Sequence, residues 1–191
     1  MILLKVNAGN SPLDLGQYLA GFEYNTAQVT NQQIKVLADT SVSGVGVILP
    51  LSTVTVEQNL NVLVADASGN AGANNVLIMG ALNPVQAVVT GSITGGVMTV
   101  TAVFSGTLAA GQFIVGAGIP IGALISSLGT GTGGTGTYNI GGGADVESAT
   151  IQASDSVESV NGAVDKKIDA NYGSAELQIL VNGSWLLGLN P

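Results

Sequence analysis

The sequence contains no histidine, no cysteine and no arginine, and its only basic residues are four lysines. Histidine titrates nearest to neutral pH and is the commonest metal ligand, while cysteine thiolates serve as nucleophiles and zinc ligands. Arginine binds phosphate and carboxylate groups through two parallel hydrogen bonds. Because all three side chains are absent, we expect a protein that is not an enzyme and has no catalytic, cofactor-binding or metal site.

Positive charge is scarce as well, since twelve acidic residues outweigh the four lysines and leave a net charge of −8. Nucleic-acid binding needs a basic patch, and an acidic surface is repelled by anionic membranes. The longest apolar run, Phe113–Ile125, has 13 residues, whereas a membrane-spanning helix needs about 20. We therefore expect neither a nucleic acid nor a membrane as a partner.

Charged residues make up only 8% of the chain, hydrophobic residues make up 46%, and the mean hydropathy is +0.49. A monomer with so little charge would expose large apolar patches, which soluble monomers rarely do. Closed cyclic assemblies bury such surfaces and leave no open interface. The composition therefore predicts a homo-oligomer, and a homotrimer is the assembly we expect.

Short runs rich in β-branched residues recur along the chain and are bounded by turn-forming residues, a pattern typical of β-strands. These runs cover residues 34–37, 45–49, 61–64, 76–79, 97–104 and 175–181. Only Ser11–Ala20 favours a short helix, because Ser11 can cap it and Pro12 suits its first turn. The pattern predicts an all-β protein built around an antiparallel sandwich or barrel-like domain.

The composition changes near residue 83. Residues 83–154 are rich in glycine, threonine and serine and contain no lysine. Disordered linkers are poor in hydrophobic residues, but this stretch holds two long apolar runs. We therefore expect residues 83–154 to be an inserted Gly/Thr-rich β module. It would interrupt a discontinuous β domain of residues 34–82 and 155–191, with residues 1–33 as a candidate anchoring arm.

Several short segments follow one another in a characteristic order, beginning with Val36–Ser41, Val45–Pro50, Leu63–Ala71 and Asn75–Ile78, and closing with Val160–Ala163, Asn171–Ser174 and Gly183–Trp185. This series resembles a β module shared by structural proteins of tailed bacteriophages. The stretch from Gly91 to Ile140 resembles a glycine-threonine repeat of phage fibre and virion proteins. The resemblance implies a virion component, often trimeric, that contacts other virion proteins such as the major capsid protein.

Two virion roles are compatible with this resemblance. The chain would be a capsid decoration or cement protein or a short head fibre, or else a tail or collar fibre or adaptor that takes part in host attachment. The short chain favours decoration slightly, because it lacks room for a long shaft or a large receptor-binding head. A polysaccharide depolymerase ranks last, since histidine and arginine are absent and aromatic residues are few.

Two local patterns resemble ligand-binding motifs. Gly129–Gly134 matches G-x-G-x-x-G, but a dinucleotide site requires a following helix, and Thr135–Ile140 resembles a strand. Asp66–Asn70 offers oxygen atoms that suit calcium, but it lacks the glycine and glutamate of an EF-hand loop. A hairpin turn with positive φ angles at Gly69 and Asn70 is the favoured interpretation of Asp66–Asn70.

Paired carboxylates can cleave glycosides when they are held at a defined separation. Asp145 and Glu147 alternate on an expected strand, and Asp165 and Asp169 are more loosely spaced. A sugar-cleaving site would also need aromatic platforms, so we interpret these residues as solvated strand faces. Trp185, the only tryptophan, is expected to anchor the core or an interface.

Overall fold

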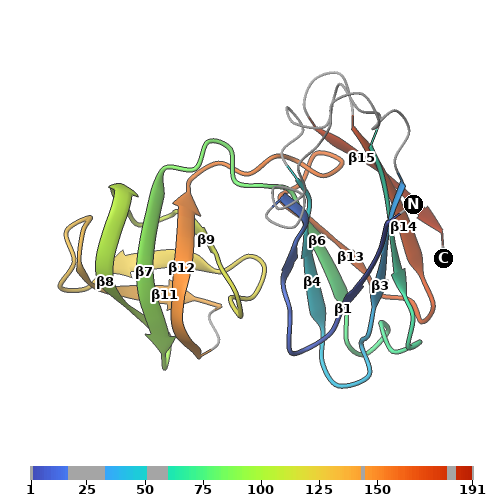
Figure 1. Ribbon diagram of the computed structural model, residues 1–191, viewed down its shortest axis with the longest axis horizontal. Helices are drawn as coiled ribbons and strands as arrows, with labels where there is room; N and C mark the ends of the chain where they lie inside the picture. Colours follow the sequence, from blue (N-terminus) through green and yellow to red (C-terminus); the bar gives the residue numbers. More distant parts are fainter. Residues whose placement is uncertain (1, 17–32, 51–59, 143–144, 180–183, 191) are drawn as a thin grey trace. The chain divides into compact units, whose positions relative to one another are not determined.

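The computed structural model describes residues 2–16, 33–50, 60–142, 145–179 and 184–190. The all-β fold predicted from the sequence is confirmed (Figure 1). The chain divides into two compact units, which we call unit 1 (residues 1–81 and 158–191) and unit 2 (residues 82–157). In the described part of the chain, no helix is long and apolar enough to cross a membrane.

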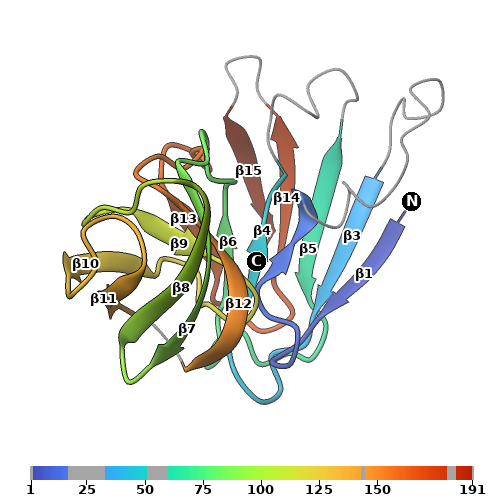
Figure 2. The same cartoon turned by 60° about the vertical axis from the view of Figure 1, so that its left-hand side comes forward.

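Unit 1 contains two sheets. The five-stranded sheet has the order β1 (Ile2–Val6), β3 (Gln33–Ala38), β5 (Asn61–Asp66), β14 (Ser174–Ile179) and β15 (Trp185–Asn190). Figure 2 shows these strands side by side. The four-stranded sheet has the order β13 (Asp165–Ile168), β6 (Val76–Met79), β4 (Val45–Ile48) and β2 (Leu13–Asp14). Their alternate apolar residues form one shared core, so unit 1 is a β-sandwich.

The first six strands alternate between the two sheets, so the chain winds from one sheet to the other and back. Within each sheet these strands pair in parallel, with Ile2 opposite Ile34 and Ile34 opposite Val62. The expectation of antiparallel pairing is therefore wrong here, although β13, β14 and β15 do pair antiparallel. Turn residues show where a strand ends, but they do not show whether the next strand pairs with it or crosses to the other sheet.

The N-terminal segment is part of unit 1. Of the expected anchoring arm over residues 1–33, residues 2–16 are part of unit 1, because β1 and β2 belong to the two sheets and Leu4, Val6 and Leu15 are buried in the core. Residues 17–32 lie outside the described residues. Each of these strands has too few residues to form a strong pattern in the sequence. Of the helix expected over Ser11–Ala20, Leu13 and Asp14 form β2 instead, Leu15 and Gly16 are helical, and residues 17–20 lie outside the described residues.

Unit 2 is a closed barrel of six strands. The strands are β7 (Ala87–Thr94), β8 (Val97–Gly106), β9 (Phe113–Val115), β10 (Leu124–Leu128), β11 (Gly136–Gly141) and β12 (Val146–Ser154), in the barrel order β10-β11-β8-β7-β12-β9. Tyr138 fills its core, and the Tyr138 hydroxyl donates to the carbonyl of Gly134 and accepts from the N–H of Gly133. The glycine-rich stretch is thus held around a buried ring.

The two chain segments that connect the units run beside each other. Glu158 N–H donates to the carbonyl of Ala81 at 2.9 Å, and Leu82 forms an antiparallel bridge with Val157. A Cβ atom at Gly80 would overlap the carbonyl oxygen of Glu158, so this close approach requires glycine. The sequence predicted that the inserted module begins after residue 82 and ends before residue 155. In the structure, unit 2 begins after residue 81 and ends at residue 157.

Deleting residues 85–153 and joining the flanks is expected to leave unit 1 folded. The two hydrophobic cores share no residue, and the connecting segments already lie side by side, which is where domain insertions are tolerated. Thermal unfolding followed by circular dichroism should retain one cooperative transition. Loss of cooperative unfolding in the deletion variant, with the full chain as the control, would show that unit 1 depends on unit 2.

Candidate functional site

The carboxylate of Asp66, at the end of β5, is the most heavily hydrogen-bonded side chain that the structure describes. Asp66 is only 3% exposed. Its Oδ1 accepts from the hydroxyl of Thr40 at 2.8 Å and from the N–H and hydroxyl of Ser68. Its Oδ2 accepts from the N–H of Ala71 at 3.0 Å and from the N–H of Tyr172 at 3.1 Å. The carboxylate therefore ties together three segments of unit 1.

The hydrogen bonds also set the ionisation of this group. Burial by itself raises the pKa of Asp66, but the donors outweigh it, chiefly the N–H of Ala71, then the hydroxyl of Thr40 and the N–H of Tyr172, so the pKa lies below its ordinary value. A carboxylate that accepts several hydrogen bonds is stabilised in its charged form. Asp66 is therefore ionised at neutral pH.

The Asp66–Asn70 turn differs from both sequence-based interpretations. Both carboxylate oxygens already face donor hydrogens, which a calcium ion would have to displace. The hairpin interpretation is wrong because β5 and β6 belong to different sheets, so the turn crosses from one sheet to the other. Gly69 has the expected positive φ, at 75°, but Asn70 does not.

Residues of the motifs singled out in the sequence make structural contacts within unit 1. The ring of Tyr172 covers Gly69, where a Cβ atom would overlap it, and Asn171 Oδ1 accepts from the N–H of Gly72 at 2.8 Å. Trp185 is fully buried in the unit 1 core, and its carbonyl accepts from the N–H of Asn161 at 2.7 Å. In the described residues, these motif residues hold loops and sheets together.

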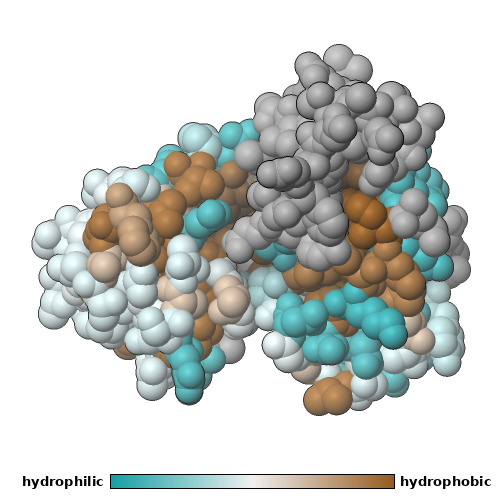
Figure 3. All heavy atoms as spheres, in the orientation of Figure 1, coloured by the Kyte–Doolittle hydropathy of each residue, from teal (hydrophilic) through white to brown (hydrophobic). Residues whose placement is uncertain are grey.

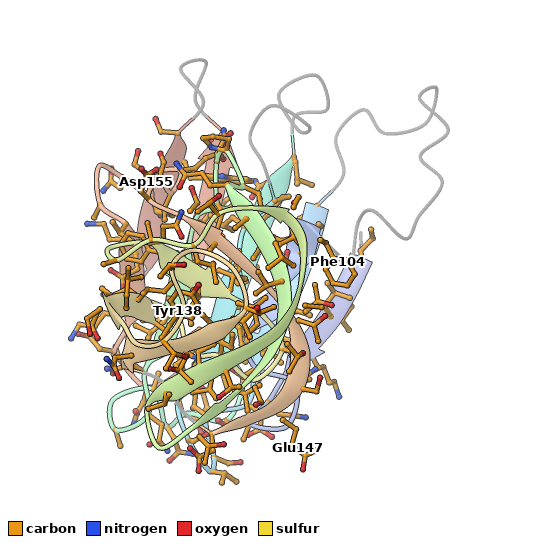
Figure 4. All side chains as sticks on the ribbon, turned by 90° about the vertical axis from the view of Figure 1, so that its left-hand side faces the viewer. Phe104, Tyr138, Glu147 and Asp155 are labelled. Atoms are coloured by element: carbon orange, nitrogen blue, oxygen red, sulfur yellow. The ribbon has the colours of Figure 1, made fainter. Side chains whose placement is uncertain are left out.

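The acidic residues that the sequence offered as carboxylate pairs lie at the surface. Asp145 Oδ1 accepts from the N–H of Gly95 at 2.7 Å and so supports the turn between β7 and β8, and Glu147 extends outward from the barrel (Figure 4). Asp165 is exposed, and Asp169 pairs with Lys167 at 3.0 Å. Across the described ranges, no three acidic, histidine or cysteine side chains are grouped closely enough to hold a metal ion.

The G-x-G-x-x-G stretch is followed by a strand. Thr130 N–H donates to the hydroxyl of Thr137 at 2.9 Å, and strand β11 begins at Gly136. A dinucleotide site needs the N-terminus of a helix at this point. Gly129–Gly134 is therefore a turn of the barrel, as its threonine-rich continuation predicts.

The surface that stands out on unit 2 is the C-terminal half of β8, residues 101–106, which we call the β8 edge. All six residues are exposed, and they are Thr101, Ala102, Val103, Phe104, Ser105 and Gly106. Phe104 is 67% exposed. Figure 3 shows apolar residues gathered in this part of unit 2, toward the upper left. Met98 and Val100 in the first half of β8 belong to the unit 2 core, but no residue of the β8 edge does.

Two irregularities in the pairing of β7 with β8 shape the β8 edge. Val89 lies opposite Val103 while Val88 lies opposite Ser105, so Phe104 is an extra residue. Thr101 is a second extra residue, because Thr90 lies opposite Ala102 and Gly91 lies opposite Val100. Such β-bulges occur at barrel rims and redirect a side chain. The bulge at Phe104 accounts for an aromatic ring that points into solvent (Figure 4).

The sequence predicted a strand over residues 97–104 but not its exposure. Its apolar residues fall on both faces, and such a strand is ordinarily buried on both sides. The one signal in the sequence is the lack of any charged residue between Asp66 and Asp145, which leaves this part of the surface without the lysines that usually guard exposed strands.

No known protein family, curated protein or solved structure matches this chain. The function is therefore inferred from its residues and their geometry.

Proposed function

We propose that the chain is a non-enzymatic structural protein of a tailed-phage virion, and that it acts by adhesion between β surfaces. The observation that carries the proposal is the uncharged, exposed β8 edge on a chain of net charge −8. Burial of apolar surface contributes about 25 cal/mol per Å², so such a surface favours attachment without any charged contact. The expected assembly is a homotrimer that contacts other virion proteins, such as the major capsid protein.

Within the virion, the proposed role is capsid decoration or cement, or a short head fibre. The order of the motifs around Asp66 and Trp185 supports the resemblance to phage structural modules, because these residues are the ones that hold unit 1 together. A tail or collar adaptor is the second candidate. The observation that favours it is that the β8 edge belongs to unit 2, which has a core of its own and so is suited to present a contact surface.

Adhesion of this kind is expected to resist both salt and chelators. High salt screens charged pairs, but the β8 edge contains none, and both oxygens of Asp66 are occupied by donors. Purified particles that carry this protein should keep nearly all copies after treatment with about 1 M salt or with EDTA. At that salt concentration the Debye length is about 3 Å, so charged contacts at the surface are largely screened. Quantitative gel analysis of pelleted particles measures the copies retained.

Two results would contradict this proposal in different ways. Release by EDTA alone would reveal a metal-dependent attachment, with Asp145 and Glu147 as the first residues to replace. Release by salt alone would mean that the acidic surface docks on a basic partner. A density map of the particle then separates the two roles, because decoration places the chain on the capsid and an adaptor places it at the neck or tail.

A further inference from the structure

The outer side of the β8 edge has no strand partner among the residues that the structure describes. Strand β11 pairs with β8 only from Val97 to Val100, whereas β7 continues along β8 to Gly106. The backbone N–H and C=O groups on that side are therefore available to another strand, and such a row of groups is a template for pairing. Lysine and proline, which often block open edges, do not occur between Thr101 and Gly106. The bulges at Thr101 and Phe104 are irregularities of the pairing with β7, on the other side of β8.

The charge distribution favours a second copy of this chain as the occupant. Each copy carries a net charge of −8, so two copies repel one another where their acidic residues meet. The charged residues of unit 2 are Asp145, Glu147 and Asp155, and none belongs to the β8 edge. The two paired strands themselves therefore bring no like charges into contact.

The residues of the β8 edge are also complementary to themselves in one register. In an antiparallel pair with its two-fold axis at Val103, Val103 lies opposite its own copy and Phe104 lies opposite Ala102. The same register sets Thr101 opposite Ser105. The pair of hydroxyl side chains, Thr101 and Ser105, is a favourable cross-strand combination. The small side chain of Ala102 leaves room for the ring of Phe104. A two-fold contact of this kind uses the same patch on both copies.

We propose that the β8 edges of two copies pair as antiparallel strands about a two-fold axis at Val103. This contact goes beyond the proposed virion role, because it names the segment, the partner and the register, and it operates in solution. It is compatible with the expected trimer, since a two-fold contact can join subunits of neighbouring trimers.

Disulfide cross-linking of the full chain tests this contact directly. The chain has no cysteine, so Val103→Cys introduces the only thiol. Opposed residues of an antiparallel pair have Cα atoms about 4.5–5.5 Å apart, which lies within the range that a disulfide spans. Under mild oxidation, Val103→Cys should form a covalent dimer at least about tenfold faster than random collision gives, because paired strands raise the effective thiol concentration.

Val97→Cys is the matched control. Val97 lies on the same strand and is 36% exposed, close to the 38% of Val103, but it lies where β11 already pairs with β8. Adding Phe104→Lys to Val103→Cys should slow cross-linking to the control rate, because it places two positive charges beside the axis. Circular dichroism checks that every variant retains its fold.

Register has its own test. A mixture of the Thr101→Cys and Ser105→Cys variants should yield a mixed disulfide faster than either variant yields a dimer alone. Equal rates for Val103→Cys and Val97→Cys would overturn the pairing. Particle retention in salt and EDTA would be unaffected by that outcome, so the proposed virion function and the β8 contact are tested separately.

Discussion

Replacing Asp66 with alanine is expected to destabilise unit 1 by about 3–5 kcal/mol, because several donors at low exposure lose their acceptor at once. The hydroxyl of Thr40 and the N–H groups of Ala71 and Tyr172 all donate to this carboxylate. A buried donor without a partner costs more than an ordinary hydrogen bond contributes. Urea denaturation, followed by the fluorescence of the single tryptophan, Trp185 in the unit 1 core, measures the change.

Asp39→Ala is the control for this prediction. Asp39 is an exposed acid in the same region, and its carboxylate accepts from the N–H of Ser41 at the surface. Its removal leaves that donor free to bind water, so the midpoint of denaturation should move little. Equal losses of stability in the two variants would show that overall charge, and not the buried hydrogen bonds of Asp66, is responsible.

The lowered pKa of Asp66 also predicts how the stability of unit 1 depends on pH. Its pKa in the folded chain is below its ordinary value, so the folded state binds this proton more weakly than the unfolded state does. The stabilisation is fully present above the ordinary aspartate pKa and is lost as the pH falls through the lowered value. Asp66→Asn, which cannot ionise, should therefore weaken the acid dependence of unfolding below about pH 4.

Replacing Gly106 with alanine is expected to destabilise unit 2 by about 3–5 kcal/mol, through the combined cost of a left-handed backbone and of overlap. Gly106 has a φ of +74°, and a Cβ atom there would overlap the carbonyl oxygen of Gln86 and lie 2.8 Å from the Cα of Ala87. Both obstacles are backbone atoms of the paired strand, so they cannot rotate away. Differential scanning calorimetry measures the loss.

Gly122→Ala separates the two causes. Gly122 has a similar φ of +83°, but a Cβ atom there would meet nothing within 4 Å. This variant should lose only about 1–2 kcal/mol, the cost of the left-handed conformation itself. If both variants lost the same amount, crowding against β7 would play no part at Gly106.

The sequence alone determined the all-β class and the positions of several strands, because local propensity and turn residues are properties of neighbouring residues. The strand predicted over residues 76–79 coincides with β6, and residues 175–179 of the strand predicted over residues 175–181 lie in β14. The lack of histidine, cysteine and arginine is likewise a property of composition, and it limits the available chemistry whatever the fold.

Tertiary structure decided what the strands do. Contacts between distant residues set the parallel winding of the first six strands and the closure of the barrel. The same holds for the hydrogen bond from the Tyr172 N–H to Asp66, two residues that are 106 positions apart in the chain. The exposure of Phe104 depends on a bulge in the pairing with β7 and on β11 ending its pairing at Val100. No local pattern encodes where a neighbouring strand stops, so only the folded chain leaves that edge open.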